Sequence, residues 1–224
     1  MSGLFAWDVY LVTDRSLSKG RSNAEIVVAA VGGGVSVVQL REKDLETRLF
    51  YEEGVKIADF LKQAGVPLII NDRIDIALAV DADGVHLGQS DMPLGVARRI
   101  LGPDKIMGVS INELDELSDE AIASADYLAV SPVFDTATKE DITTPWGLDG
   151  VRRIRSLTDK PLVAIGSMKE ENAREVVAAG ADSVAVVSAI VSAADPESAV
   201  RTLVREVRAG KSARQCPRVR PWSS

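Results

Sequence analysis

The chain contains little of the chemistry on which many metal and redox sites depend. Its 224 residues include one cysteine, Cys216, and one histidine, His86. A lone cysteine excludes an internal disulfide and a zinc cluster built from cysteine, and a lone histidine excludes a site made of several histidines. Such sparse use of cysteine is typical of proteins from a reducing compartment.

Signals for a membrane or for nucleic acid are also missing. The N-terminal segment has no basic start followed by a long apolar run, and no uninterrupted apolar stretch reaches the length of a membrane span. The net charge of −7 gives no basic field that would attract nucleic acid. We therefore expect a cytoplasmic protein without membrane or nucleic-acid partners, in which the cations that bind an anion are gathered locally.

What is present is a regular alternation of short apolar runs and helical segments. A length of 224 residues with 46% hydrophobic residues suits one large α/β domain. Helical periodicity predicts helices such as 45–63 and 169–179, and a short helix at 75–82. The intervening runs predict eight strands, at 9–13, 35–40, 67–71, 84–87, 105–110, 127–131, 161–166 and 183–188.

Most of these strands are apolar on both faces, as the buried strands of a parallel sheet are. Eight strand–helix units in about 200–250 residues predict a single-domain (β/α)8 TIM barrel. We place the barrel at residues 1–210 and expect 211–224, which is basic and has no apolar period, to form a flexible tail. A doubly wound open sheet is the alternative, although no G-x-G-x-x-G sequence follows the first strand.

Polar residues follow several of the strands, at the ends that form the mouth of a barrel and carry its chemistry. Gln39, Arg41 and Lys43 alternate and therefore share one face, which suits a clamp for an anion. The alternative is that the two cations form ion pairs with nearby carboxylates, namely Glu42, Asp44 or Asp72.

Two carboxylates end neighbouring strands. Asp72 follows Asn71 at the end of the third strand, and Asp91 comes 19 residues later, after the fourth. Carboxylates at adjacent strand ends can share a hard cation, and Mg²⁺ favours such sparse protein ligation. The alternative for each aspartate is to cap the N-terminus of the following helix.

Later strand ends carry weaker signals. Ser110 ends the fifth strand, and hydroxyls with an ammonium group follow the sixth at Thr136, Thr138 and Lys139. The last two strand ends, 166–167 and 187–188, lie where barrels often bind phosphate. A strand histidine such as His86 is more often structural than catalytic, and no pairing of a nucleophile with a base is present.

Taken in order, the segments VVQLREK, INDR, DGVHLGQSDM, GVS, SPVFDTATK, AIG and VVSAI resemble the thiamine phosphate synthase family, from about Tyr10 to Ile190. The resemblance implies a (β/α)8 barrel that transfers a pyrimidinylmethyl group from its diphosphate to a thiazole phosphate. It also implies release of pyrophosphate, dependence on Mg²⁺ and a dissociative reaction without a protein nucleophile.

The resemblance also implies roles for individual residues. Asp72 and Asp91 would bind Mg²⁺. The residues that would hold the pyrimidine diphosphate are Gln39, Leu40, Arg41, Glu42, Lys43, Asn71, Ser110 and Lys139, of which Arg41, Lys43, Ser110 and Lys139 would act in catalysis. The residues that would hold the thiazole phosphate are Thr136, Ala137, Thr138, Gly166, Ser167, Val187 and Ser188.

The chain departs from the family pattern at three places: Ser131 and Ser167 stand where glycine is usual, and no histidine follows the fifth strand, where Asn112 lies. That histidine is expected in the related thiazole tautomerases, which are the first alternative function. A non-catalytic barrel that binds a phosphate ligand is the second. The sequence does not specify the oligomeric state, and a homodimer stays open.

Overall fold

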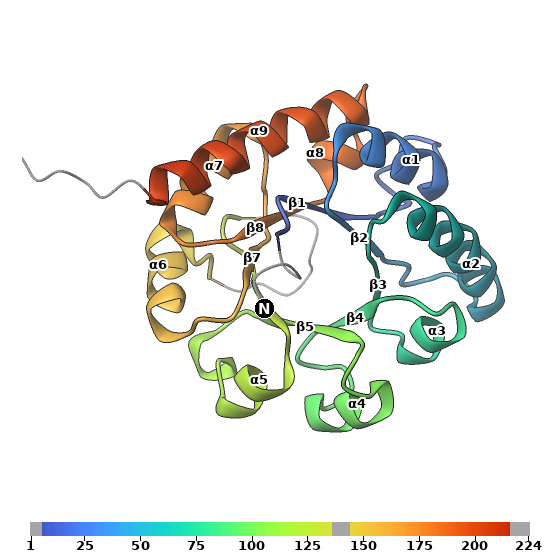
Figure 1. The fold of residues 1–224 in the computed structure, drawn as a ribbon, viewed down its shortest axis with the longest axis horizontal. Helices are drawn as coiled ribbons and strands as arrows, with labels where there is room; N and C mark the ends of the chain where they lie inside the picture. The colour runs from blue at the N-terminus through green and yellow to red at the C-terminus, as the bar shows by residue number, and fades with distance from the viewer. Residues whose placement is uncertain (1–5, 136–143, 216–224) are drawn as a thin grey trace, which may run out of the picture.

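Eight parallel strands form a closed barrel in the computed structural model, which describes residues 6–135 and 144–215 (Figure 1). The strands follow one another around the barrel in chain order, and β1 closes the ring by pairing with β8, where Tyr10 lies opposite Ala185. Their bounds are β1 Val9–Val12, β2 Val37–Leu40, β3 Leu68–Asn71, β4 Gly84–Leu87, β5 Ile106–Ile111, β6 Tyr127–Val130, β7 Leu162–Ala164 and β8 Ser183–Val186. The predicted fold and all eight predicted strands are therefore confirmed.

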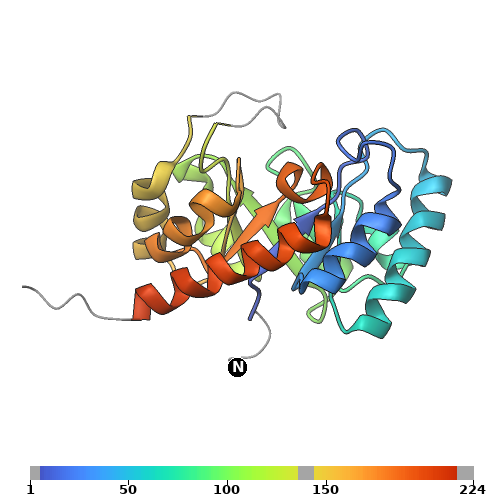
Figure 2. The same ribbon diagram turned by 90° about the horizontal axis from the view of Figure 1, so that it is seen from above.

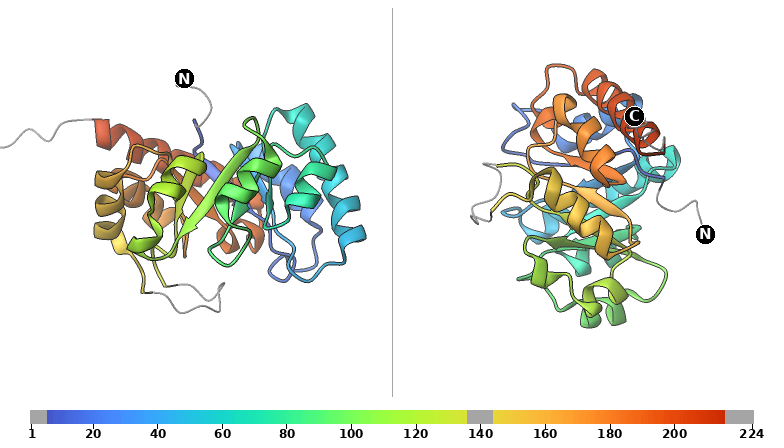
Figure 3. Two further views of the ribbon diagram at one scale, coloured as in Figure 1. Left: turned by 90° about the horizontal axis from the view of Figure 1, so that it is seen from below. Right: turned by 90° about the vertical axis from the view of Figure 1, so that its left-hand side faces the viewer.

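Helices surround the strands on the outside of the barrel, as the side views show (Figure 2 and Figure 3). The last helix, α9, packs against α7 and α1 and so joins the two ends of the chain. The helices are α1 Asn23–Gly33, α2 Thr47–Ala64, α3 Ile74–Ala79, α4 Leu94–Leu101, the 3-10 turn η1 Leu114–Glu116, α5 Asp119–Ser124, α6 Gly147–Leu157, α7 Glu170–Ala179, α8 Ser188–Val191 and α9 Pro196–Gln215. No helix in 6–135 or 144–215 is long and apolar enough to cross a membrane.

Alternation along the strands separates two apolar layers. Side chains such as Tyr10, Val37 and Ile69 belong to a cluster inside the barrel. Their strand neighbours, such as Leu11 and Leu40, belong to a larger cluster shared with the helices. Successive strand residues point to opposite faces, so every second residue near the end of a strand points inward and can reach the mouth.

Three aspartates fasten alternate strand pairs at the end of the barrel where the strands begin. Asp126 donates its backbone N–H to the carbonyl of Met107, and its Oδ2 accepts the N–H of Met107 at 2.8 Å. Asp83 forms the same reciprocal pair with Leu68, and Asp182 forms it with Leu162. These bonds satisfy backbone groups that the strand ladder leaves open.

Arginines from the outer helices hold two of these aspartates. Arg98 of α4 donates to Asp126 at 2.6 Å, and Arg155 of α6 donates to Asp182 at 3.0 Å. Each arginine also donates to carbonyl groups at the nearby chain turns. The aspartates therefore join β3 to β4, β5 to β6 and β7 to β8. The arginines tie the last two of these strand pairs to the outer helices α4 and α6.

The boundary of the flexible tail expected at 211 is wrong, because α9 continues to Gln215. Lys211 donates to Asp8 Oδ1 at 2.8 Å and to the carbonyl of Trp7, beside the start of β1. Arg214 donates to Asp182 Oδ1 at 2.9 Å. The basic residues of this segment therefore belong to the barrel, while 216–224, with Cys216, lie outside the described residues.

Replacing Asp126 tests the strand fastening. We expect Asp126→Ala to lower the free energy of unfolding by about 1–3 kcal/mol, because the buried N–H of Met107 and the Arg98 guanidinium lose their acceptor. Urea unfolding measures this change. The exposed Asp104 provides a matched control, since Asp104→Ala should stay within about 0.5 kcal/mol of the original protein. Equal losses in the two variants would contradict the fastening role.

Candidate active site

The mouth of the barrel, where the strands end, gathers the cations predicted after β2. Arg41 donates its backbone N–H to Thr13 Oγ1 at 3.0 Å, and its side chain forms an ion pair with Asp14 at 3.5 Å. Lys43 is exposed. Both cations lie close enough to Asp72 to act on the pKa of its carboxyl group. Of the predicted carboxylate partners, Arg41 therefore interacts with Asp72, and it forms its ion pair with Asp14, which the sequence did not indicate.

Two residues of this segment have side chains that lie elsewhere. Leu40 is fully buried in the outer apolar layer because it follows the inward-facing Gln39. Glu42 accepts hydrogen bonds from Arg15 and Asn23, which tie the loop after β2 to the loop after β1. The assignment of Leu40 and Glu42 to the pyrimidine diphosphate stays a prediction, and any contact by Leu40 would be made by its backbone. The side chain of Leu40 faces outward because side chains alternate along the strand, and the side chain of Glu42 is held by its ion pair with Arg15.

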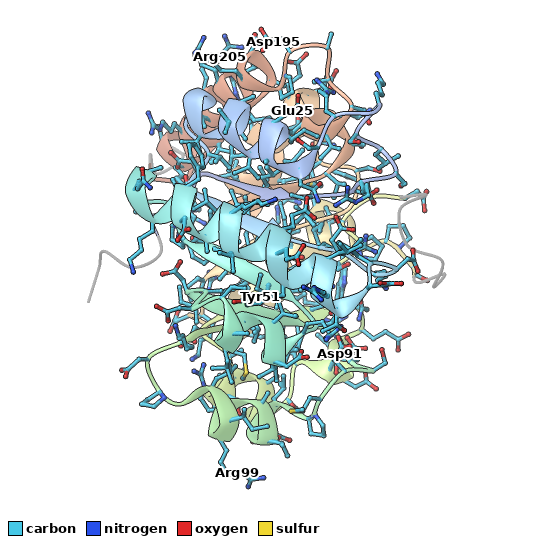
Figure 4. All side chains as sticks on the ribbon, turned by 90° about the vertical axis from the view of Figure 1, so that its right-hand side faces the viewer. Glu25, Tyr51, Asp91, Arg99, Asp195 and Arg205 are labelled. Carbon is cyan, nitrogen blue, oxygen red and sulfur yellow. The ribbon has the colours of Figure 1, made fainter. Side chains whose placement is uncertain are left out.

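The carboxylates of Asp72 and Asp91 face one another at the ends of β3 and β4, and Figure 4 shows Asp91 at the mouth end of the barrel. The pKa of Asp72 is raised from 3.8 to about 6, first by burial and then by the hydrogen bond and charge of Asp91. Lys43 and Arg41 act in the opposite direction. Asp72 also holds a left-handed backbone conformation with φ of 60°.

Neither aspartate caps a helix. The residues that precede α3 and α4 are Arg73 and Pro93, and neither helix has a side-chain cap. Asp91 instead accepts the backbone N–H of Gly88 at 2.7 Å, which orients its carboxylate. The capping alternative is therefore wrong for both residues.

The pair fits a hard divalent cation. Two carboxylates held together against their own repulsion leave negative charge that a cation would neutralise, and the donors are oxygens, which Mg²⁺ prefers. Among the described residues, no group of three or more histidine, cysteine, aspartate or glutamate side chains gathers in a metal-binding arrangement. A cation at this pair would thus take most of its ligands from water or a bound anion, as Mg²⁺ commonly does.

Ser110 and Gln39 are joined through the interior of the barrel. Ser110 Oγ lies 3.0 Å from His86 Nε2, and Gln39 Nε2 donates to Tyr10 Oη at 2.8 Å. The Gln39–Tyr10 pair and the Ser110–His86 pair are connected by Tyr127, whose hydroxyl lies 2.9 Å from both Tyr10 Oη and His86 Nδ1. The expected structural role of His86 is supported. The sequence did not reveal the two tyrosines, although a tyrosine at an inward position of a short apolar strand is a usable signal.

Gly166 and Ser167, two of the residues predicted to hold a phosphate, form the turn after β7. Gly166 has φ of 110°, and a Cβ there would come within 2.7 Å of Pro132 Cβ. Ser167 also takes a left-handed conformation, with φ of 50°, and its Oγ donates to the carbonyl of Asp135. Ser167, where glycine is usual in the family, thus has a positive φ that glycine adopts more readily than serine.

Val187 and Ser188 lie at the start of α8, where Val187 is half-buried and Ser188 is exposed. Asn71, by contrast, is buried at the end of β3. The predicted residues Thr136, Ala137, Thr138 and Lys139 lie outside the described residues.

Comparison with known proteins identifies the family. The family model described as thiamine monophosphate synthase matches residues 9–190, which is most of the chain. The chain belongs to the thiamine monophosphate synthase family. The match spans all eight strands of the barrel and the segments that carry the mouth residues.

Individual relatives agree with the family model. The chain is 52% identical to a thiamine-phosphate synthase from Chloroflexus aurantiacus over 88% of this chain and 91% of the relative. It is 48% identical to one from Haloarcula marismortui, over 92% and 99% of the two chains. The solved thiamine phosphate pyrophosphorylase from Pyrococcus furiosus superposes with a TM-score of 0.85 at 37% identity, covering 92% of this chain and 98% of that structure.

Replacing Asp72 by asparagine tests the cost of ionising this carboxylate, which is half-buried and lies beside Asp91. Because the folded-state pKa lies above 3.8, ionised Asp72 costs stability that accumulates as the pH rises through the interval from 3.8 to about 6. In magnesium-free protein near neutral pH, we expect Asp72→Asn to raise the free energy of unfolding by about 1 kcal/mol, after discounting for partial exposure. The gain should vanish below about pH 4, where the aspartate is protonated in both states.

Urea unfolding in EDTA at the two pH values measures the effect of Asp72→Asn. Asp75→Asn is a matched control, since this nearby carboxylate has its pKa lowered by Arg73 and should lose stability when neutralised. A loss of stability in Asp72→Asn near neutral pH would contradict the cost of ionising Asp72.

Adding a methyl group at Gly166 tests the close approach in the turn after β7. We expect Gly166→Ala to lower the free energy of unfolding by about 2–3 kcal/mol, because positive φ and the contact with Pro132 both oppose a Cβ. Gly102→Ala is the matched control, because Gly102 also has positive φ but has open space around it, and it should cost only about 1 kcal/mol. Equal losses by urea unfolding would show that the contact is unimportant.

Proposed function

We propose that the chain catalyses the thiamine phosphate synthase reaction. In this reaction the C–O bond between a pyrimidinylmethyl group and its diphosphate breaks, and a C–N bond to the ring nitrogen of a thiazole phosphate forms. Pyrophosphate leaves with the bonding electron pair. The observation that carries the proposal is the facing pair Asp72 and Asp91 with Arg41 and Lys43 beside it, in a chain of this family.

The charges at the mouth suit a diphosphate leaving group. Asp72 and Asp91 would hold Mg²⁺, which when bound supplies positive charge to the diphosphate oxygens. Arg41 presents a planar fork, which its ion pair with Asp14 and its backbone bond to Thr13 hold at the mouth. Lys43 adds a second positive charge. These groups stabilise the charge that develops on pyrophosphate as the C–O bond breaks.

The remaining contacts follow from the positions of the residues and from the family resemblance. Gln39, Asn71 and Ser110 lie at the inner rim of the mouth, where they would orient the pyrimidine diphosphate. Lys139 is assigned to the same substrate by resemblance. The residues assigned to the thiazole phosphate are Thr136, Ala137, Thr138, Gly166, Ser167, Val187 and Ser188.

The turn after β7 is suited to that second phosphate. Gly166 and Ser167 both have positive φ in this turn, and backbone N–H groups in turns at this end of a barrel are suited to binding a phosphate. A thiazole held there would face the pyrimidine across the mouth. Holding both substrates in this way would bring the thiazole nitrogen close to the pyrimidinylmethyl carbon, which a reaction without a covalent enzyme intermediate needs.

The geometry does not favour the thiazole tautomerase reaction. The single histidine, His86, is buried between Tyr127 and Ser110. Asn112 donates its backbone and side-chain N–H groups to Glu116. A non-catalytic barrel would not need the repelling carboxylate pair. The cytoplasmic location and the homodimer stay predictions.

Product formation by purified protein tests the proposed function. We expect thiamine phosphate and pyrophosphate from the two substrates with Mg²⁺, and neither product in EDTA. A tautomerase would instead isomerise the non-aromatic thiazole phosphate tautomer without the pyrimidine substrate. Folded protein that forms no product with Mg²⁺ would contradict the synthase function.

Removing the Lys43 charge tests its role in leaving-group stabilisation. We expect Lys43→Ala to lower kcat/KM about 100-fold, because one cation near the developing charge is lost. The melting temperature should not change, since Lys43 is exposed. Lys56→Ala, at an exposed lysine of α2, is the matched control and should keep full activity. Retention of full activity in Lys43→Ala would refute the role.

A further inference from the structure

A continuous chain of hydrogen bonds crosses the interior of the barrel between two residues of the mouth. It runs from Gln39 to Tyr10 at 2.8 Å, to Tyr127 at 2.9 Å, to His86 at 2.9 Å and to Ser110 at 3.0 Å. The five residues come from five different strands, β2, β1, β6, β4 and β5. Gln39 and Ser110 are thus joined through the two tyrosines and the histidine.

The chain is shielded from water. Tyr10 and Tyr127 are 1% and 0% exposed, and the other three side chains are no more than 9% exposed. Burial raises the pKa of both tyrosine hydroxyls above the ordinary value, so both stay protonated at neutral pH. Each hydroxyl therefore has one proton to donate, and in this setting its direction is set by its neighbours.

The packing holds the tyrosine rings in place. Trp7 meets both rings edge-on, at centroid distances of 5.7 Å to Tyr10 and 5.4 Å to Tyr127. A Cβ at Gly108 would lie 2.0 Å from Tyr127 Cζ, so the glycine makes the room that the ring occupies. Gly108 stands two residues before Ser110 on the same inward face of β5. The same short segment therefore accommodates the tyrosine and supplies the serine.

The direction of the hydrogen bonds follows from the Gln39 end. Gln39 donates to Tyr10, and we infer that each hydroxyl donates to the next group along the chain, Tyr10 to Tyr127 and Tyr127 to His86 Nδ1. A neutral His86 then carries its proton on Nε2 and donates it to Ser110 Oγ. Ser110 then accepts from His86 and keeps its own proton to donate to another group.

We propose that His86 and Tyr127 are positioning residues that fix Ser110 as a hydrogen-bond donor toward an anionic oxygen of the diphosphate substrate. The proposal rests on the proposed function and names the chemistry at one point of its site. A serine hydroxyl is free to rotate and can accept as readily as it donates. With one lone pair of Ser110 taken by His86, donation toward the anion no longer requires a reorganisation when the substrate binds.

Gln39, at the other end of the chain of hydrogen bonds, also has groups left for a ligand. One N–H of Gln39 Nε2 is donated to Tyr10, so the amide oxygen of Gln39 can accept a hydrogen bond from a ligand and the second N–H can donate one. With this direction of the hydrogen bonds, the chain joins an amide oxygen that can accept at Gln39 to a hydroxyl that can donate at Ser110.

The tautomer of His86 is the first test, and it does not depend on activity. His86 is the only histidine, so ¹⁵N-histidine labelling of untagged protein gives a single imidazole spectrum. We expect the Nε2–H tautomer in the original protein. Tyr127→Phe and Tyr10→Phe should each produce a mixture of tautomers, because Nδ1 loses its donor or that donor loses its direction. Tyr51→Phe, on the outer helix α2 (Figure 4), should leave the tautomer unchanged.

A double-mutant cycle tests the functional link. We expect Tyr127→Phe to lower kcat about tenfold, with a smaller change in KM, while Ser110→Ala lowers kcat by about 100-fold. If Tyr127 acts through Ser110, Tyr127→Phe should have no further effect in the Ser110→Ala background. Thermal melts show which variants are folded, and Tyr10→Phe replaces Tyr127→Phe if the latter is not.

The outcomes separate the two levels of the proposal. An original protein without synthase activity overturns the proposed function. An active original protein whose His86 is the Nδ1–H tautomer overturns the positioning role, and so do additive effects of Tyr127→Phe and Ser110→Ala. A single tautomer that survives Tyr127→Phe likewise overturns it.

Discussion

The closed ring of parallel strands, with side chains alternating inward and outward, is the constraint on which the rest of the structure depends. Pairing of β1 with β8 leaves no open edge. The strands are buried on both faces, by the cluster inside the barrel and by the helices outside it. Parity then sorts neighbouring residues, as it sends Gln39 inward and Leu40 outward. The inward residues nearest the mouth can contact a substrate. The inward residues deeper in the barrel hold them in place by hydrogen bonds.

The mouth contains local arrangements that reduce stability. The facing carboxylates of Asp72 and Asp91 repel one another, and Asp72 and Ser167 both hold left-handed backbone conformations. Such strain persists where the surrounding fold determines the geometry. Here the strand-fastening aspartates, such as Asp126, and the ion pairs of α9 lie at the opposite end of the barrel, where they stabilise the frame without occupying the site.

The fold and most of the mouth were predictable from sequence, because apolar runs and the polar residues that follow them are local signals. The extent of α9 was not, because its last turn is held by Asp8 and Asp182, far away in the chain. The hydrogen bonds that Glu42 accepts were not predictable for the same reason, since Arg15 lies in the loop after β1 and Asn23 is the first residue of α1. The contact between Tyr10 and Tyr127 spans 117 residues, and only barrel closure brings them together.

In the proposed function, Asp72 and Asp91 would hold Mg²⁺, which would supply positive charge to a bound diphosphate. Isothermal titration of pyrophosphate, with Mg²⁺ and with EDTA, tests this most directly because it requires no turnover. We expect binding in Mg²⁺ to be at least about 100-fold tighter than in EDTA, since without the ion Asp72 and Asp91 repel the ligand. Equal affinity in the two conditions would contradict a metal-bridged site.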